Sequence, residues 1–146
     1  MSKSLLPLLI FLSLSSSSFS QIDFIPLTED FIRDSVHNSG WVSNDSTQKK
    51  DYENMYIVFE EDTISFLYFN IIEAIGVNFC AYKSSYNDLL FEITLISCDS
   101  EIELEFVYCY FTKSREMLVF FSEKRYPMTK ESIDQFDWLR FSKIQL

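Results

Sequence analysis

The sequence predicts a mainly β domain, namely an antiparallel up-and-down barrel or closed sandwich of about eight strands with a short N-terminal helix. Two observations carry this prediction. Apolar and polar residues alternate along 54–70 and again along 89–111, and further short apolar runs separated by turn residues continue to the end of the chain. At 146 residues, the chain is long enough for one domain around a single core.

Residues 1–20 are expected to be a secretory signal peptide, which leaves 21–146 as a single domain. Lys3 precedes an apolar stretch from Leu5 to Leu14, and serines then run to Ser20, with the small-x-small arrangement that precedes cleavage. The apolar stretch is too short to span a bilayer. We therefore expect an exported domain, periplasmic or secreted, with no membrane span after signal removal.

A short amphipathic helix is predicted for residues 28–38. Thr28 can cap its first turn, Glu29 and Asp30 are acidic residues in that turn, and Gly40 follows its end. Apolar side chains recur at helical spacing at Phe31, Ile32 and Val36.

The first alternating segment predicts a hairpin. If Glu60 pairs with Thr63, a set of large apolar side chains falls on one side of both strands. These residues are Met55, Ile57, Phe59, Ile64, Phe66 and Tyr68.

The second alternating segment predicts another hairpin, with Asp99 and Ser100 in its turn. In this register the inner face holds Phe91, Ile93, Leu95, Ile102, Leu104, Phe106 and Tyr108. The outer face holds Glu92, Thr94, Glu101, Glu103 and Glu105. We interpret the glutamates as the solvent face of a half-buried strand, because a straight row of carboxylates does not wrap a calcium ion.

Four further strands, one of them the run from Met117 to Glu123, complete the predicted sheet. Residues 40–44, 77–83 and a stretch from Phe136 read as strands, and 129–135 reads as a helical turn. In the run from Met117 to Glu123, the predicted inner residues are Met117, Val119 and Phe121, beside Phe106 and Tyr108. Leu118 and Phe120 on the other face are also apolar, so the N-terminal helix, a second sheet or a partner must cover them.

Charge and cysteine content exclude several classes of function. The chain has 22 acidic and 12 basic residues, and no basic cluster that would bind nucleic acid or an anionic membrane. Three cysteines cannot all pair, so we expect at least one free thiol and no disulfide framework, with buried, inert cysteines. With His37 as the sole histidine and no C-x-x-C spacing, we expect no metal site and no cofactor.

No conventional catalytic constellation is visible, so we expect a protein that is not an enzyme. His37 stands alone, and no G-x-S-x-G nucleophile elbow is present. A thiolate pair of Cys109 and His37 is conceivable, but nothing in the sequence brings the two together.

The layout of the chain resembles the lipocalin and calycin-like barrels. A short leading helix is followed by the opening strand with Gly40 and Trp41, then by hairpins, and Trp138-Leu139-Arg140-Phe141 lies near the end. In that family a tryptophan near the start packs against an arginine of the last strand, and the matching positions are Trp41 and Arg140. The resemblance implies a barrel with one closed end and an apolar interior for a small hydrophobic molecule.

Two binding functions follow as hypotheses. In the first, the barrel holds a small apolar ligand, and the pocket is lined by Phe66, Tyr68, Phe91, Phe106, Tyr108 and Phe121. Alternatively, these rings only fill the interior. In the second hypothesis, an acidic surface binds a basic protein partner, as an inhibitor, immunity or adhesion module would. Its contact row would be Glu92, Glu101, Glu103 and Glu105.

Overall fold

The computed structural model describes residues 22–43, 54–69, 74–99 and 104–145. The expected signal peptide at 1–20 lies outside the described residues, and so do Glu101 and Glu103 of the glutamate row. Tyr68 belongs to a described strand, but its side chain is outside the description.

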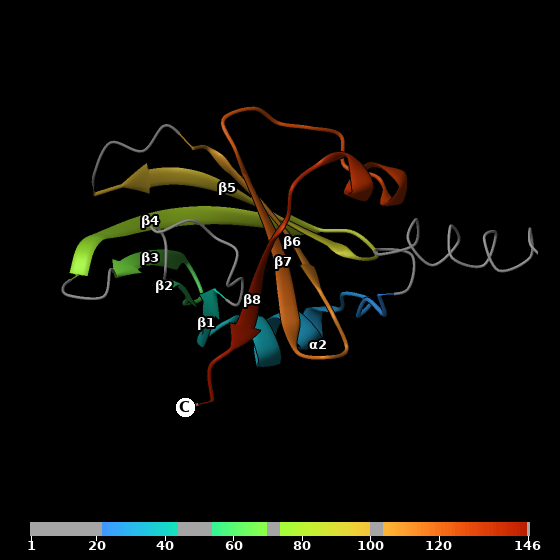
Figure 1. The fold of residues 1–146 in the computed structure, drawn as a ribbon, viewed down its shortest axis with the longest axis horizontal. Helices are drawn as coiled ribbons and strands as arrows, with labels where there is room; N and C mark the ends of the chain where they lie inside the picture. The colour runs from blue at the N-terminus through green and yellow to red at the C-terminus, as the bar shows by residue number, and fades with distance from the viewer. Residues whose placement is uncertain (1–21, 44–53, 70–73, 100–103, 146) are drawn as a thin grey trace, which may run out of the picture.

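Eight antiparallel strands form a closed barrel, which confirms the predicted fold class (Figure 1). The strands are β1 (Ser39–Ser43), β2 (Asn54–Phe59), β3 (Thr63–Phe69), β4 (Ala74–Tyr86), β5 (Leu90–Cys98), β6 (Phe106–Phe111), β7 (Glu116–Ser122) and β8 (Leu139–Lys143). Each strand pairs with the next along the chain, and β8 closes the barrel by pairing with β1 through Trp41 and Lys143. Closure leaves the sheet without an unpaired edge.

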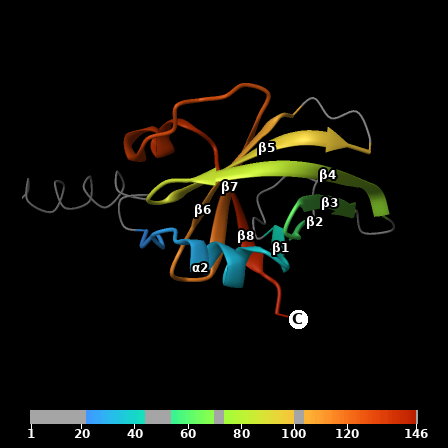
Figure 2. The ribbon, with the colours of Figure 1, turned by 180° about the vertical axis from the view of Figure 1, so that it is seen from behind.

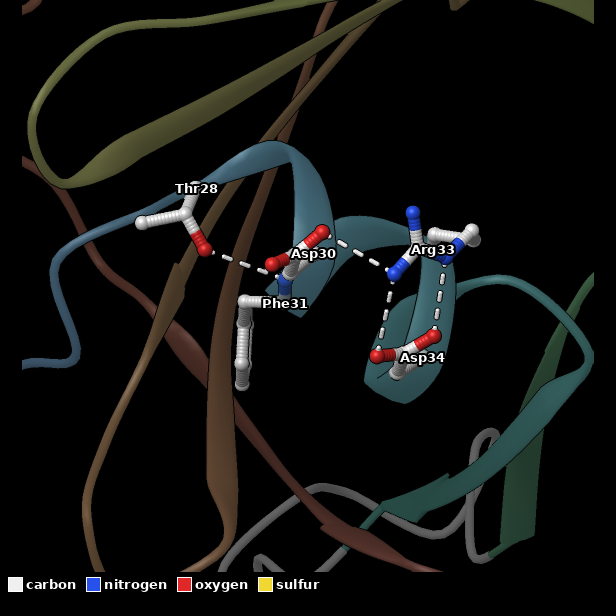
Figure 3. A network of polar contacts seen from close by, with 5 residues as sticks. All are labelled: Thr28, Asp30, Phe31, Arg33 and Asp34. Carbon is white, nitrogen blue, oxygen red and sulfur yellow. Dashed lines mark hydrogen bonds and ion pairs between the residues drawn. The ribbon is translucent and has the colours of Figure 1, made fainter.

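The predicted N-terminal helix is present. It comprises α2 (Glu29–Phe31) and a π-helical turn, η1 (Ile32–Val36). At its start the Oγ1 atom of Thr28 accepts a hydrogen bond from the backbone N–H of Phe31 at 3.1 Å, which satisfies one free donor of the first turn (Figure 3). Figures 1 and 2 both show α2 at the same end of the barrel as the turn between β6 and β7.

The helix ends differently from the sequence prediction. Asn38, with a φ of 58°, adopts the left-handed conformation that reverses the chain after a helix. Gly40, the predicted terminator, already belongs to β1. Ile32 and Val36 are buried, so the helix packs its apolar face onto the core of the barrel.

The hairpin of β2 and β3 has the predicted register. Ile57 pairs with Phe66, and the backbone N–H of Glu60 donates to the carbonyl of Thr63 at 2.8 Å. Of the six residues predicted to share the inner face, the five whose side chains are described are buried in the core: Met55, Ile57, Phe59, Ile64 and Phe66.

The register of β5 and β6 corrects the sequence prediction by one residue. Phe91 pairs with Cys109, and Thr94 pairs with Phe106. A shift by one exchanges the two faces of a strand, so Phe106 and Tyr108 lie on the outside of the barrel. The inner face of β6 is formed instead by Val107, Cys109 and Phe111.

The interior residues of β7 are those predicted, but they meet different neighbours. Met117, Val119 and Phe121 pair with the inner residues of β6, and not with Phe106 and Tyr108. The turn contains the predicted Lys113 and Ser114 but is longer, because Thr112 donates its backbone N–H to the carbonyl of Glu116 at 2.9 Å.

A second apolar cluster covers the outer face of β6 and β7. The connection between β7 and β8 carries a 3-10 helix, η3 (Lys130–Gln135), and is the long orange-to-red excursion in Figure 1. The Trp138 ring lies 5.2 Å from that of Tyr110, and the Phe136 ring lies 4.6 Å from that of Phe120. The β7–β8 connection therefore covers Leu118 and Phe120. The sequence predicted the N-terminal helix, a second sheet or a partner for this role.

The cysteines also depart from expectation. Cys80 on β4 and Cys98 on β5 are opposite one another and form a disulfide, although no disulfide framework was expected. Cys109 is free and buried, as expected for at least one thiol. Within the described part of the chain, no helix is long and apolar enough to cross a membrane.

Candidate functional site

The interior nearest the N-terminal helix is filled by aromatic rings. Phe91 has no exposed surface, and its ring centroid lies 6.4 Å from that of Phe59 and 6.2 Å from that of Phe111. Phe111 in turn lies 5.6 Å from the Trp41 ring. Phe91, one of the predicted ligand-contacting residues, therefore packs in the filled part of the interior, next to the N-terminal helix.

Two other predicted ligand-contacting residues meet elsewhere in the interior. Phe66 and Phe121 face each other edge to face, with ring centroids 5.7 Å apart. Phe66 is buried, whereas Phe121 is half-buried, as is Leu95 of β5. The interior is thus more accessible around Phe121 than around Phe91. Nothing is described for the side chain of Tyr68, the remaining inner residue of the predicted set.

Phe106 and Tyr108 do not line the interior, which corrects their predicted place in the pocket. Tyr108 is fully buried under the outer cluster, where its ring stacks on Phe120 at 6.3 Å. Its hydroxyl oxygen accepts the backbone N–H of Tyr126 at 2.7 Å. This hydrogen bond joins the β7–β8 connection to β6 of the barrel.

The glutamate row predicted to meet a basic partner is described only in part. Glu92 forms an ion pair with Arg125 at 2.9 Å, with the Glu92 side chain mostly covered. Glu105 is exposed, and Glu101 and Glu103 lie outside the described residues. Recognition of a basic protein therefore stays a hypothesis, and Glu92 already has a cation of this chain as its partner.

The cation that packs over the Trp41 ring is Lys143, and not Arg140 as the resemblance implied. Its ammonium lies 5.9 Å from the centroid of the indole ring and donates to the carbonyl of Ser35 at 3.1 Å. Arg140, the residue matched from the resemblance, lies instead 4.0 Å from Glu116 on the outer side of β8, where it pairs with Leu118. The alternation of β8 explains this, since Lys143 shares the inner face with the buried Phe141.

A pocket of about 790 Å³ opens beside Trp41, at the end of the barrel that carries the helix. Its walls come from the helix, the start of β1, the β6–β7 turn and the end of β8. The lining includes three basic residues that the sequence analysis did not select: Lys113, Arg115 and Lys143. They are distant in sequence, and only the closed barrel brings them together.

The titratable groups of the interior favour neutral forms. Burial raises the pKa of the Cys109 thiol, which is the opposite of what a thiolate nucleophile requires. Burial, reinforced by the charge of Asp62, raises the pKa of Tyr82 to about 12. His37 is the C-cap residue of η1, whereas Cys109 lies on β6. Among the described residues, no three metal-ligating side chains gather into a cluster.

Comparisons of the chain with protein-family models, with curated proteins and with solved structures found no match. The fold and the sites described above define the class: a closed, eight-stranded antiparallel barrel with a helix at one end.

Proposed function

We propose that this chain is an exported, non-catalytic binding protein that holds a small apolar ligand inside a lipocalin-like barrel. The observation that carries the proposal is the uneven burial of the interior. Four half-buried apolar residues of the strands pack against the core: Leu95, Cys98, Phe121 and Leu139. Each lies in the half of its strand that is remote from the helix, because β5 and β7 run away from the helix and β8 runs toward it.

This distribution supports a ligand site in the half of the interior around Phe121. At the helix end, Phe59, Phe91 and Phe111 leave little room, since each is almost fully buried. Binding sites for apolar molecules are lined by apolar and aromatic side chains, and Leu95, Phe121 and Leu139 supply such side chains here. The cation over Trp41, supplied here by Lys143, supports the likeness to lipocalin barrels.

The test uses a neutral apolar dye, phenylnaphthylamine, whose fluorescence rises in apolar surroundings. We expect Phe121→Glu to reduce dye affinity by about tenfold or more, because a carboxylate in the interior is costly to desolvate. The matched control is Phe79→Glu, since Phe79 is 44% exposed on β4. Near-ultraviolet circular dichroism checks that both variants stay folded.

Equal dye affinity for Phe121→Glu and the unmodified chain, with both folded, would contradict the proposal. A folded chain that binds no dye and releases no apolar compound on solvent extraction would contradict it as well. In either case the aromatic residues serve only to fill the barrel.

A further inference from the structure

The pocket beside Trp41 has a charge opposite to that of the chain as a whole. The chain carries 22 acidic and 12 basic residues. The described residues that line this pocket include Lys113, Arg115 and Lys143 but no aspartate or glutamate. Such a local excess of positive charge attracts anions, and most strongly where apolar walls reduce screening.

Three carboxylates at this end of the barrel lie against other cations, Arg33 and Arg140. Asp30 and Asp34 both contact the guanidinium of Arg33, at 2.9 and 3.0 Å (Figure 3). Glu116 lies 4.0 Å from Arg140 on the outer side of β8. Within the described part of the chain, no ion pair joins the three pocket cations to a carboxylate. Their charge is therefore available to a bound molecule.

The pocket also has an apolar floor. The rings of Phe31 and Trp41 both pack against Phe111, with centroid separations of 5.5 and 5.6 Å. Ile25 and Ile144 extend this apolar surface. With a volume of about 790 Å³, the pocket is within the usual range for small-molecule sites.

Two lining residues hold an uncommon backbone conformation. Asn38 and Arg115 have φ values of 58° and 64°, and they are the non-glycine residues with positive φ in the described chain. Such conformations are sparsely populated, especially for arginine, and often occur at functional sites. At Arg115 this conformation is held by hydrogen bonds on both sides, because its N–H donates to Thr112 at 3.1 Å and its carbonyl accepts from Lys143 at 3.4 Å.

From these observations we infer that the pocket beside Trp41 is a second binding site, which takes a small organic anion with an aromatic or acyl body. The anionic group lies among Lys113, Arg115 and Lys143, and the apolar body contacts Phe31 and Phe111. This site is separate from the proposed interior site, because Phe91, Phe111 and their neighbours fill the barrel between them. The inference does not depend on the proposed function.

The test compares two dyes of similar body, the anionic anilinonaphthalene sulfonate and the neutral phenylnaphthylamine. The chain has two tryptophans, so a Trp138→Phe background leaves Trp41 as the sole indole reporter in the pocket wall. Binding is measured as quenching of Trp41 fluorescence. The test variant is Lys113→Gln with Arg115→Asn, since asparagine tolerates positive φ. Lys143 is left unchanged because it also holds Ser35 and Trp41.

We expect the test variant to bind the sulfonate at least about tenfold more weakly, while its binding of the neutral dye changes by less than about twofold. The control, Lys83→Gln with Lys124→Gln, removes the same charge from exposed positions outside the pocket and should keep sulfonate affinity within about twofold. Undiminished sulfonate binding in the folded test variant would overturn the inference. An equal loss of sulfonate affinity in the control variant would also overturn the inference, since it would show that affinity follows the overall charge of the chain. Failure of the interior site would appear separately, as neutral-dye binding that is insensitive to Phe121→Glu.

Discussion

The ammonium of Lys143 lies 5.9 Å from the centroid of the Trp41 ring, across the β1–β8 pairing that closes the barrel. The same ammonium donates to the carbonyl of Ser35 at the end of the helix. One side chain therefore links the first strand, the last strand and the helix.

Replacing Lys143 should destabilise the fold. We expect Lys143→Met to lower the free energy of unfolding by about 1 to 2 kcal/mol, because it removes a cation–π contact and a cation at a helix C-terminus. Lys143→Arg should recover about half of the loss or more. Urea denaturation measures both changes. The control is Arg140→Met, which breaks a long, exposed ion pair and should cost less than about 0.5 kcal/mol. An Arg140 variant less stable than the Lys143 variant would refute this assignment.

The disulfide should contribute measurably to stability. Cys80 and Cys98 are 18 positions apart, so their bond closes a loop of moderate length. Cys80→Ala with Cys98→Ala is expected to lower the free energy of unfolding by about 2 to 4 kcal/mol, mainly because the unfolded chain gains freedom. A reducing agent should destabilise the parent chain and leave the double variant unchanged. Titration of thiols in the denatured, unreduced chain should find one thiol, that of Cys109, and a count of three would contradict the pairing.

The outer aromatic cluster should contribute to stability as a hydrophobic core does. Trp138 is only 8% exposed, and its indole N–H donates to the carbonyl of Ile133 at 2.6 Å. Trp138→Ala is expected to cost about 3 to 5 kcal/mol of unfolding free energy, as large-to-small changes in cores do. Phe79→Ala, at an exposed position of β4, should cost less than about 1 kcal/mol. Similar small losses in both variants would show that the β7–β8 connection is not a structural cover.

Alkaline pH should destabilise the barrel through its buried tyrosines. Burial and, after it, the charge of Asp62 raise the pKa of Tyr82 to about 12 in the folded chain, whereas an unfolded tyrosine titrates near pH 10. The folded chain keeps this proton longer, so the stabilising contribution is complete below about pH 10 and is lost as pH rises toward about 12.

Tyr82→Phe should reduce the decrease in unfolding free energy at alkaline pH. At neutral pH the variant should be less stable by about 1 kcal/mol, because it loses the hydrogen bond that the Tyr82 hydroxyl donates to the Glu60 carbonyl at 2.9 Å. Tyr86→Phe is the matched control, since Tyr86 is 45% exposed. Urea denaturation at several pH values measures both variants, and parallel pH profiles for the two would contradict the role given to Tyr82.

The sequence predicted the architecture well where one face of a strand is clearly polar. Along β3, Thr63 and Ser65 alternate with Ile64 and Phe66, so a shift by one residue would expose the apolar set. The turn at Glu60 to Thr63 then fixes the same register independently. The strands of the two hairpins followed from this alternation, and the leading helix followed from helical spacing and the capping residue Thr28.

The candidate sites were less accessible to sequence reasoning. The residues of the cationic pocket, Lys113, Arg115 and Lys143, lie in a turn and at the end of the last strand, with no shared motif. Only the pairing of Lys143 with Trp41 and of Glu116 with Ser142 brings these segments together. A lysine in an irregular turn has no periodic signal that marks its partners.

By itself, then, the sequence determined a set of antiparallel hairpins that close into a barrel or a sandwich, because the period of two dictates strands and short turns join neighbours. The pairing of β8 with β1 decided for the barrel. It did not determine which face of β6 points inward. Val107, Cys109 and Phe111 alternate with Tyr108 and Tyr110, so both faces are apolar and either could be buried. The tertiary structure decided the matter: Trp138 and its neighbours cover the tyrosine face, and the free energy of burial is gained on both sides of the strand.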